Sequence, residues 1–380
     1  MIAITTLTAW AWAATFFTWV ALYRISRWRK ALAKGTPVRT SSPAPAILLL
    51  RPVDAPTAEE RLRLGEQIDY PGSLEQVVLS PYRLRLPESV RWLPSDPPTR
   101  NRKVGHVVYG LRVLEAEGAL EERFVLSVDA DVRVDAALLR SLAEGLASGA
   151  ALTTAAPEPE LELGAGVGSS WSARAWRSLL LHTHHSFVAL HAMSAGSNAV
   201  CGKALGLGAM AQEILPDLAG HAGEDLELSK RVRARGGVVS LVAAPARVPQ
   251  DPAASAREVL SRLTRWMQVL RAQRPQLYPA VPLLCTPTLP LILAALYLGI
   301  YGDNGDGIRG LLTAVSALVI SRIALSLLLR GGTGLEWLSG EALLGAAFLQ
   351  SLTTRRLCWR GRHYALLRGG RMEPDSDSAS

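Results

Sequence analysis

Cysteine is scarce in this chain, with three among 380 residues. Cys201, Cys285 and Cys358 form no CxxC pair and show no cysteine/histidine spacing typical of metal ligands. The sequence therefore lacks the pattern of a zinc site. We expect three free thiols in a reducing compartment.

Charge is absent from residues Ile2–Tyr23, a run long enough to cross about 30 Å of hydrocarbon as a helix. No cation precedes this run and a cluster follows it, which is opposite to the pattern of a cleaved signal peptide. Its tryptophans are candidate interface anchors: Trp10, Trp12 and Trp19. We expect a transmembrane anchor over residues 1–23, with its N-terminus outside, and a basic linker over residues 24–45.

Two further apolar runs lie at Val281–Tyr301 and Leu311–Leu329, and the loop between them carries Asp303 and Asp306. We predict a transmembrane helix from each run, with the loop outside. Arg322 interrupts the second run, at a cost of about 2.5–3.5 kcal/mol if it is central. It should therefore snorkel, pair or face a polar cavity, unless the helix is tilted or shifted.

The apolar stretch Ala342–Leu349 is too short to span a bilayer, so residues 335–352 are predicted to form an interfacial or re-entrant helix. One crossing at the N-terminus and two within residues 281–330 leave the middle of the chain and the basic tail, residues 353–380, in the cytosol. Cations flank the apolar segments on this side: Arg24, Arg27, Arg29, Lys30, Lys34, Arg355, Arg356, Arg360, Arg362 and Arg368. This bias predicts a multi-pass membrane protein with its central domain in the cytosol. We expect the membrane to be a bacterial inner membrane.

The net charge of +8 is compatible with nucleic acid, anionic lipid headgroups or a phosphorylated substrate as partner. The cations crowd beside the apolar segments, where headgroups lie. The middle of the chain lacks the interleaved aromatic and basic residues that stack nucleic-acid bases. We expect the lipid bilayer, and no nucleic acid, as a partner.

Four histidines, His182, His184, His185 and His191, lie in a helical pattern rich in serine, leucine and alanine. No carboxylate is near them in the sequence. A cluster on a helix surface or at the membrane interface is favoured over a metal site.

Residues 46–275 alternate short apolar runs with helical patterns. Strands are predicted at 46–50, 76–80, 90–93 and 124–128, and helices at 58–68, 104–117 and 136–146. The alternation predicts an α/β domain with a parallel, doubly wound sheet. Such sheets bind ligands outside the carboxyl ends of their strands. Asp129, Ala130 and Asp131 are therefore predicted to lie in the site.

Two carboxylates one residue apart at a strand end can bind one hard divalent cation, which neutralises a diphosphate. Asp129 and Asp131 have this spacing, although an Asp turn that caps the next helix explains it too. Further on, Glu224 and Asp225 begin a predicted helix at 226–235, where acidic residues also suit the helix N-terminus.

The third motif, RLTRW, places Arg262 and Arg265 on one helical face beside Trp266. Arginine forks bind phosphate oxygens, and an indole offers a flat platform with one donor. A basic amphipathic helix at the membrane would have the same pattern.

The order DAD, GED and RLTRW, followed by apolar segments, resembles the ceramide glucosyltransferase family among the inverting family-2-type glycosyltransferases, including bacterial hopanoid and sphingolipid relatives. Supporting stretches are RPVDA at 51–55, DYPG at 69–72, NRKVGHVVYGLR at 101–112, VDADVRVD at 128–135 and CWRGRHYALLRGGR near the end. Together with the N-terminal anchor they cover almost the whole chain.

The resemblance implies a GT-A (Rossmann-like) domain that transfers one sugar, with inversion, from a UDP-sugar to a lipid hydroxyl. Asp129 and Asp131 would hold Mg²⁺ or Mn²⁺ and the donor diphosphate, and Asp225 would be the general base. The remaining implied donor- or acceptor-binding residues are Asn101, Lys103, Glu224, Arg262, Arg265 and Trp266.

One departure concerns the nucleotide. Family members carry an Asp after the second strand, but the stretch Ser80–Leu84 has no carboxylate, and Asp96 downstream has a different context. Two alternatives stay open: a processive polysaccharide synthase, which usually has more crossings, and a catalytically lapsed homologue that binds lipid or acts as a scaffold. The sequence leaves the sugar and the lipid acceptor undefined.

Overall fold

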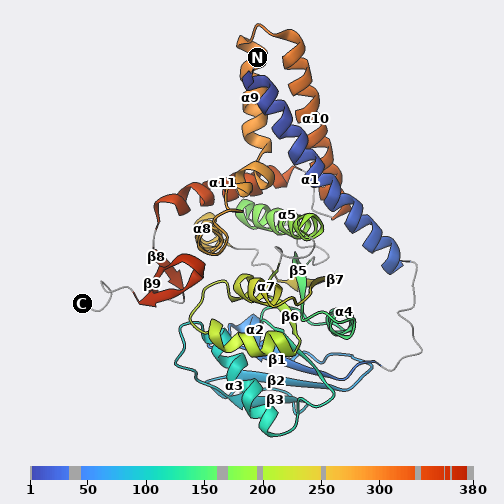
Figure 1. Cartoon of the computed structure of the whole chain (residues 1–380), viewed down its shortest axis with the longest axis vertical. Helices are drawn as coiled ribbons and strands as arrows, with labels where there is room; N and C mark the ends of the chain where they lie inside the picture. The colour runs from blue at the N-terminus through green and yellow to red at the C-terminus, as the bar shows by residue number, and fades with distance from the viewer. Residues whose placement is uncertain are drawn as a thin grey trace.

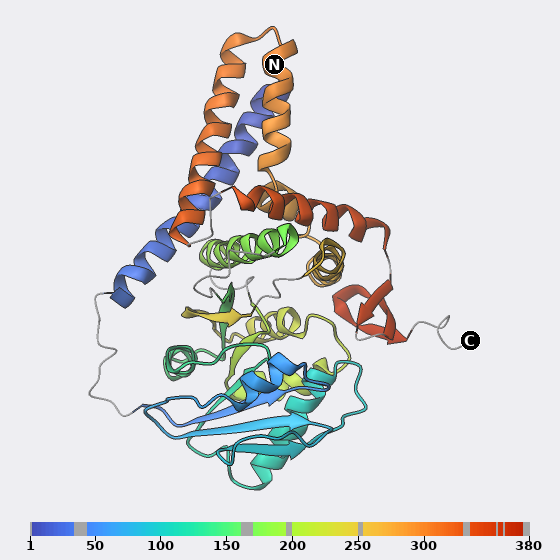
Figure 2. The same cartoon turned by 180° about the vertical axis from the view of Figure 1, so that it is seen from behind.

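The computed structural model describes residues 2–33, 44–160, 170–194, 200–249, 254–329, 335–354, 356–359 and 362–374. A sheet with flanking helices lies at one end, long helices lie across the middle, and a helical bundle lies at the other end (Figures 1 and 2). Part of the predicted linker (34–43), Arg355, Arg360 and the last residues of the predicted tail (375–380) lie outside the described residues.

The central sheet has seven strands in the order β3-β2-β1-β4-β6-β5-β7. Their bounds are β1 Ile47–Pro52, β2 Leu74–Ser80, β3 Val90–Pro94, β4 Phe124–Val128, β5 Leu152–Pro159, β6 Ala204–Leu207 and β7 Val239–Val248. The α/β prediction and its strands are confirmed. The purely parallel sheet is wrong, because β6 enters between β4 and β5 antiparallel to both. The sheet is therefore mixed, with mostly parallel neighbours.

Alternate residues of β1 belong to two hydrophobic cores on opposite faces of the sheet, as strand geometry requires. Leu48 and Leu50 pack with helices on one face, and Ile47 and Leu49 pack on the other. The first face is covered by α3 (Arg102–Ala116), α6 (Ala209–Ile214) and α7 (Glu224–Ala234) and the second by α4 (Ala136–Ala147), while α2 (Ala58–Gly65) follows β1. Each buried leucine or isoleucine contributes about 1.5–3 kcal/mol.

Helix caps fix where the polypeptide turns from strand to helix. The side chain of Asn101 accepts a hydrogen bond from the Val104 amide at the start of α3, and Asp135 does the same for Leu138 in α4. Such caps contribute about 1 kcal/mol each. Asp135, not the DAD motif, caps α4, so Asp129 and Asp131 are not needed for this cap.

Three long helices lie between the sheet and the bundle: α5 (Trp171–Met193), α8 (Ala256–Gln273) and α11 (Glu336–Thr353) (Figure 1). Their apolar faces share one core that includes Trp176, Leu263 and Ala347. The helix predicted at 335–352 is thus confirmed as a helix, while its place at a membrane surface stays a prediction.

The bundle consists of α1 (Ile2–Ala33), α9 (Thr288–Tyr301) and α10 (Gly305–Leu328). Among the described helices, α10 is long and apolar enough to cross a membrane, and α9 is a shorter apolar helix. The predicted span Val281–Tyr301 is not one helix, because a π-helical turn at Val281–Cys285 precedes α9. The predicted linker is also corrected, because α1 continues through its first residues to Ala33.

Two of the tryptophans predicted as interface anchors donate hydrogen bonds to other helices of the bundle or to the turn before α9, and their place at a membrane interface stays a prediction. The indole of Trp10 donates to the Leu283 carbonyl at 2.6 Å, and that of Trp19 donates to Ser321 Oγ at 2.8 Å. Ile4 packs with Ile308 at the far end of the bundle. The N-terminus and the turn between α9 and α10 therefore share one end, as the predicted topology requires (Figure 1).

The predicted surface position of the histidines is wrong for His182, His184 and His185, which are buried. Arg322 of α10 is also buried, and its Nη1 atom lies 2.9 Å from His185 Nε2. Its Nη2 atom donates to the Leu284 carbonyl at 2.6 Å, and its Nε atom lies 3.8 Å from Glu341 of α11. Of the predicted outcomes for Arg322, the structure confirms pairing.

The predicted basic tail contains a three-stranded antiparallel sheet formed by β8 (Arg356–Trp359), β9 (Arg362–Leu366) and β10 (Met372–Pro374). Leu357, Tyr364 and Met372 pack with Ala222 in a small core. The tail is therefore a folded element, because its alternating apolar residues are buried against the domain. The three cysteines are free, as predicted.

Candidate active site

The carboxyl end of β4 places Asp129 and Asp131 in a turn that a buried arginine holds. Arg51, at the end of β1, is 1% exposed. Its Nη2 atom donates to the carbonyls of Asp129, Ala130 and Val132 at 3.0–3.1 Å. Burial lowers the pKa of Arg51 to about 10, against the opposing effect of Asp131 and Asp129, so it stays charged at neutral pH. The arginine thus fixes the backbone of the DAD motif.

Two lysines bind the carboxylates of this turn. Lys103 Nζ lies 2.8 Å from Asp129 Oδ1, and Lys203 Nζ lies 3.2 Å from Asp129 Oδ2 and 2.5 Å from Asp131 Oδ2. Burial alone would raise the pKa of Asp129, but Lys103 and Lys203 outweigh it and hold this pKa below its ordinary value. Asp129 is therefore ionised at neutral pH.

The GED motif turns into α7 through a left-handed glycine. Gly223 has φ 68°, and a Cβ there would overlap Val269 of α8, so the turn requires glycine. Glu224 accepts a hydrogen bond from Asn101 Nδ2 at 3.0 Å and lies 3.2 Å from Lys103 Nζ. Lys103 thus joins the GED motif to the DAD motif.

Asp225 is held by backbone amides. Its Oδ2 atom accepts from Gly202 at 2.7 Å and its Oδ1 atom from Leu226 at 2.9 Å. Burial and the neighbouring charge of Glu224 raise the pKa of Asp225 to about 6, against the lowering effect of Lys103. A carboxylate with this pKa is mostly ionised at pH 7 yet accepts a proton more readily than an exposed one.

The charge on Glu224 should set the pH range in which Asp225 can accept a proton. Because Asp225 accepts a proton only when ionised, any activity that uses it as the predicted general base should fall as the pH drops through about 6. Glu224→Gln removes the like charge but keeps an oxygen for Asn101, so the pKa of Asp225 and the acid limb of kcat/KM should both move down. An acid limb that stays in place or moves up in a pH–rate profile would show that another group controls it.

The resemblance implies an Asp after β2, but the chain has no carboxylate at Ser80–Leu84, and this edge of the sheet is formed differently. Ser80 is buried at the end of β2, and its carbonyl accepts a hydrogen bond from Ser95 after β3. Asp96 thus reaches the same edge from the neighbouring strand. Arg102 pairs with both Asp96 and Asp54, at 2.6 Å from Asp54 Oδ1. Two acidic side chains therefore lie at this edge, although neither follows β2.

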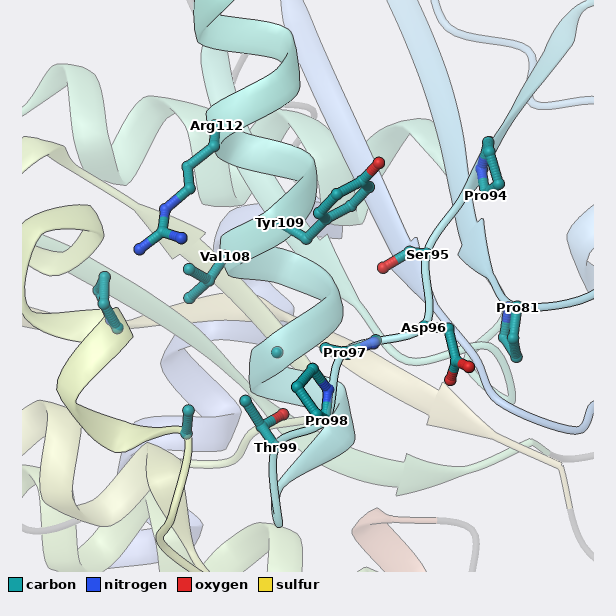
Figure 3. Close-up of a pocket in the computed structure, with 13 residues that line it drawn as sticks. Pro81, Pro94, Ser95, Asp96, Pro97, Pro98, Thr99, Val108, Tyr109 and Arg112 are labelled. Carbon is teal, nitrogen blue, oxygen red and sulfur yellow. The ribbon is translucent and has the colours of Figure 1, made fainter.

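A pocket of about 580 Å³ lies beside this edge, between α3 and the loop after β3 (Figure 3). Asp96 and Ser95 line it from the loop, and Tyr109 and Arg112 line it from α3. None of the residues that line it belongs to the Asp129, Asp131 and Asp225 cluster. The pocket is therefore adjacent to the predicted nucleotide edge rather than part of the carboxylate cluster.

The RLTRW motif lies on α8, which contacts the GED turn through its C-terminal half. Gln273 Nε2 donates to the Ala222 carbonyl at 2.8 Å. Nearer the start of the helix, the Arg262 guanidinium lies over the ring of Trp176 at 5.2 Å, and Trp266 packs on the same ring at 5.3 Å. Arg262 and Trp266 thus contact α5. Arg265 lies one helical turn before Val269, which packs beside Gly223, so Arg265 is on the helical face toward the GED turn.

The C-terminal sheet also holds the GED turn. The Ala222 amide donates to the Gly370 carbonyl at 2.7 Å, and the Met372 amide donates to the Gly220 carbonyl at 2.8 Å. Arg100, just before Asn101, donates to the Met372 carbonyl. This C-terminal strap, residues 368–372, therefore fixes the polypeptide that precedes both Glu224 and α3.

Gly370→Ala should lower an activity that depends on the GED turn by about 10–100-fold, because small displacements of catalytic groups have effects of this size. Gly370 has φ 79°, and a Cβ there would lie 2.5 Å from the Ala222 carbonyl oxygen and overlap Gln273. Gly369→Ala is the matched control, since φ is 80° and no atom lies within 4 Å of its Cβ position. Both variants should lose about 1–2 kcal/mol of stability. Equal activity in the two variants would contradict a positioning role for the strap.

The structure brings together six of the nine predicted site residues: Asn101, Lys103, Asp129, Asp131, Glu224 and Asp225. Sequence reasoning missed Lys203, Arg51 and the strap. The adjacent glycines Gly369 and Gly370 are typical of a turn, but nothing in the sequence indicates that this turn contacts Ala222.

Comparison with known proteins identifies the family of this chain. The profile of glycosyl transferase family 21 matches residues 93–372, which include Lys103, Lys203 and the DAD, GED and RLTRW motifs but not Arg51. No curated protein matches the sequence. A solved structure, mannosyltransferase PcManGT from Pyrobaculum calidifontis in complex with GDP-Man and Mn²⁺, is 14% identical, with a TM-score of 0.45, over 91% of this chain and 99% of that one. The family match covers well over half of the chain, and the chain belongs to glycosyl transferase family 21, the ceramide glucosyltransferase family.

Proposed function

We propose that this glycosyltransferase transfers a single sugar, with inversion, from a UDP-sugar to the hydroxyl of a membrane lipid of the ceramide, sphingolipid or hopanoid type. The observation that carries the proposal is the position of Asp225. It has a raised pKa of about 6, and its neighbour Glu224 shares the ammonium of Lys103 with Asp129 of the DAD motif. A base and a charge-binding site for a diphosphate are thus adjacent.

Asp225 takes the proton of the acceptor hydroxyl as that oxygen attacks the anomeric carbon. The bond between this carbon and the nucleoside diphosphate breaks on the opposite side, and the configuration inverts. A positioned base contributes about 10²–10⁴ in rate. The amides of Gly202 and Leu226 orient the carboxylate for this step.

The residues of the DAD motif fit a divalent cation such as Mg²⁺ or Mn²⁺. Asp129 and Asp131 both contact one cationic atom, and Asp131 Oδ1 is buried without a hydrogen-bond partner in the described part of the chain. The described residues hold no group of three or more metal-ligating side chains, so phosphate and water oxygens would complete the coordination. When bound, the cation would neutralise charge on the leaving diphosphate.

We assign the remaining predicted residues to the donor and the acceptor. Lys103 is placed to balance charge on the donor side, and Asn101 orients Glu224. We assign Arg265 to the diphosphate because its helical face points to the GED turn. Arg262 and Trp266 then form, with Trp176, an aromatic and basic surface for the acceptor.

The apolar exterior of the bundle supports a membrane location. Large hydrophobic side chains on α1, α9 and α10 are exposed, among them Phe16, Leu293, Ile300, Ile320 and Leu327. Such a surface fits hydrocarbon better than water. We place α1, α9 and α10 in the bilayer as a multi-pass anchor, with the sheet on the cytosolic side, so that a lipid acceptor can approach the site from the membrane.

Incubation of the purified protein with membrane lipid extract, radiolabelled UDP-sugars and Mg²⁺ or Mn²⁺ tests this function. We expect label in the lipid fraction from one donor, and loss of product with chelator. GDP-mannose serves as a donor control, and polymeric product would identify a processive synthase. Absence of lipid product with every donor and metal would refute the proposal.

A further inference from the structure

Lys203 stands directly before β6, and the sheet itself places it beside the DAD motif. Val128 of β4 pairs with Ala204 of antiparallel β6, and the Asp129 amide donates to the Lys203 carbonyl at 2.9 Å. The backbone therefore fixes residues 129 and 203 as neighbours, whichever rotamer the lysine adopts.

The Lys203 ammonium lies between the two carboxylates that fit a metal. It is 2.5 Å from Asp131 Oδ2 and 3.2 Å from Asp129 Oδ2, while Lys103 contacts the other oxygen of Asp129. Lys103 is bound more widely, because it also contacts the Gly202 carbonyl at 2.6 Å and Glu224 at 3.2 Å. Of the two lysines, Lys203 is thus the one whose ammonium pairs with both Asp129 and Asp131.

The lysine ammonium and a divalent cation exclude each other from the position between Asp129 and Asp131, because both are positively charged. An ammonium and a divalent cation that bind the same two carboxylates would lie a few ångströms apart and repel each other. The Lys203 side chain is 28% exposed and long, so it can turn away when a stronger cation binds. An ammonium displaced in this way would remain within reach of an anion bound at the metal.

We propose that Lys203 is an internal competitor of the divalent cation: its ammonium binds Asp129 and Asp131 in the donor-free protein, and metal bound with the donor displaces it toward the diphosphate. This inference rests on the proposed metal-assisted transfer. It predicts that the free protein binds metal weakly and that the nucleotide diphosphate increases metal affinity.

Titration of the full-length protein in detergent with Mn²⁺ alone, followed by electron paramagnetic resonance, tests the competition. Lys203→Met should bind Mn²⁺ about tenfold more tightly than the wild type, because removal of about 1.4 kcal/mol of competition changes an equilibrium tenfold. Lys203→Arg keeps the positive charge and should bind like the wild type. Lys230→Met, at a half-exposed lysine paired with Glu227 on α7, is the matched control and should change nothing.

Wild-type Mn²⁺ affinity in a folded Lys203→Met would overturn the proposal, and Lys203→Gln provides the same comparison if the methionine variant does not fold. Asp131→Asn separates this failure from failure of the metal site. If Asp131→Asn loses Mn²⁺ binding while Lys203→Met is unchanged, only the competition is wrong. If Asp131→Asn binds Mn²⁺ like the wild type, the DAD metal site of the proposed function is wrong, and the competition with it.

Discussion

Asp225→Asn should lower the rate of sugar transfer by about 10²–10⁴, the usual contribution of a general base. The amide keeps the size of the carboxylate and can still accept a hydrogen bond from Gly202 or Leu226, but it cannot take a proton at neutral pH. Binding of the donor should change little, because Asp225 accepts hydrogen bonds from the amides of Gly202 and Leu226 and makes no contact with the DAD carboxylates that the structure describes. Initial rates at saturating donor, together with the donor Kd, measure the two effects separately.

Asp217→Asn is the matched control for this substitution. Asp217 lies just before α7 and pairs with Arg231, but 65% of its side chain is exposed. An exposed ion pair of this kind contributes about 0–1 kcal/mol, so activity should stay near that of the wild type. If Asp225→Asn transfers sugar as fast as Asp217→Asn, Asp225 is not the base.

Arg51→Leu should cause the largest loss of stability, about 3–5 kcal/mol, which is typical when one side of a buried charged network is removed. The carbonyls of Asp129, Ala130 and Val132 would lose the donor that they share, and Ala130 and Val132 are themselves buried. Metal binding should weaken too, because the DAD turn would no longer be held. For a domain of this size the change corresponds to a fall in Tm of about 6–20 °C.

Arg61→Leu, on the exposed surface of α2, removes the same charge without a buried network. Its effect should lie within about 0.5 kcal/mol of zero. Thermal unfolding of both variants in the same detergent, with and without Mn²⁺, distinguishes loss of fold from loss of metal binding. A stable Arg51→Leu variant with wild-type metal affinity would contradict the role assigned to Arg51.

The parts of the fold predicted correctly were those determined by local pattern. The apolar runs that became β1 to β4 are bounded by turn residues, and the DAD motif follows the last of them, so its place at a strand end could be inferred. The direction of β6 could not be inferred from the sequence. The four residues of β6, Ala204–Leu207, carry no local signal of strand direction. The antiparallel direction of β6 depends on its pairing with β4, which is far away in the sequence.

The missed site residues share a physical cause. Arg51 and Lys203 are charged residues whose roles arise from contacts to residues 78–81 and 72 positions away in the sequence. The buried histidines depend in the same way on Arg322, 137 positions from His185. By contrast, the interrupted span at 281–301 had a local signal, because Pro282 and Pro287 cannot continue a regular helix without a kink or break.

Mass spectrometry of membrane lipids tests the central claim most directly, namely that this chain glycosylates a lipid with Asp225 as base. Lipids are compared from cells that express the wild type, Asp225→Asn or neither, with equal amounts of both proteins in the membrane. The account predicts a lipid species heavier by one sugar residue in the wild-type cells alone. An unchanged lipid profile in those cells, or the same glycolipid with Asp225→Asn at the wild-type level, would contradict it.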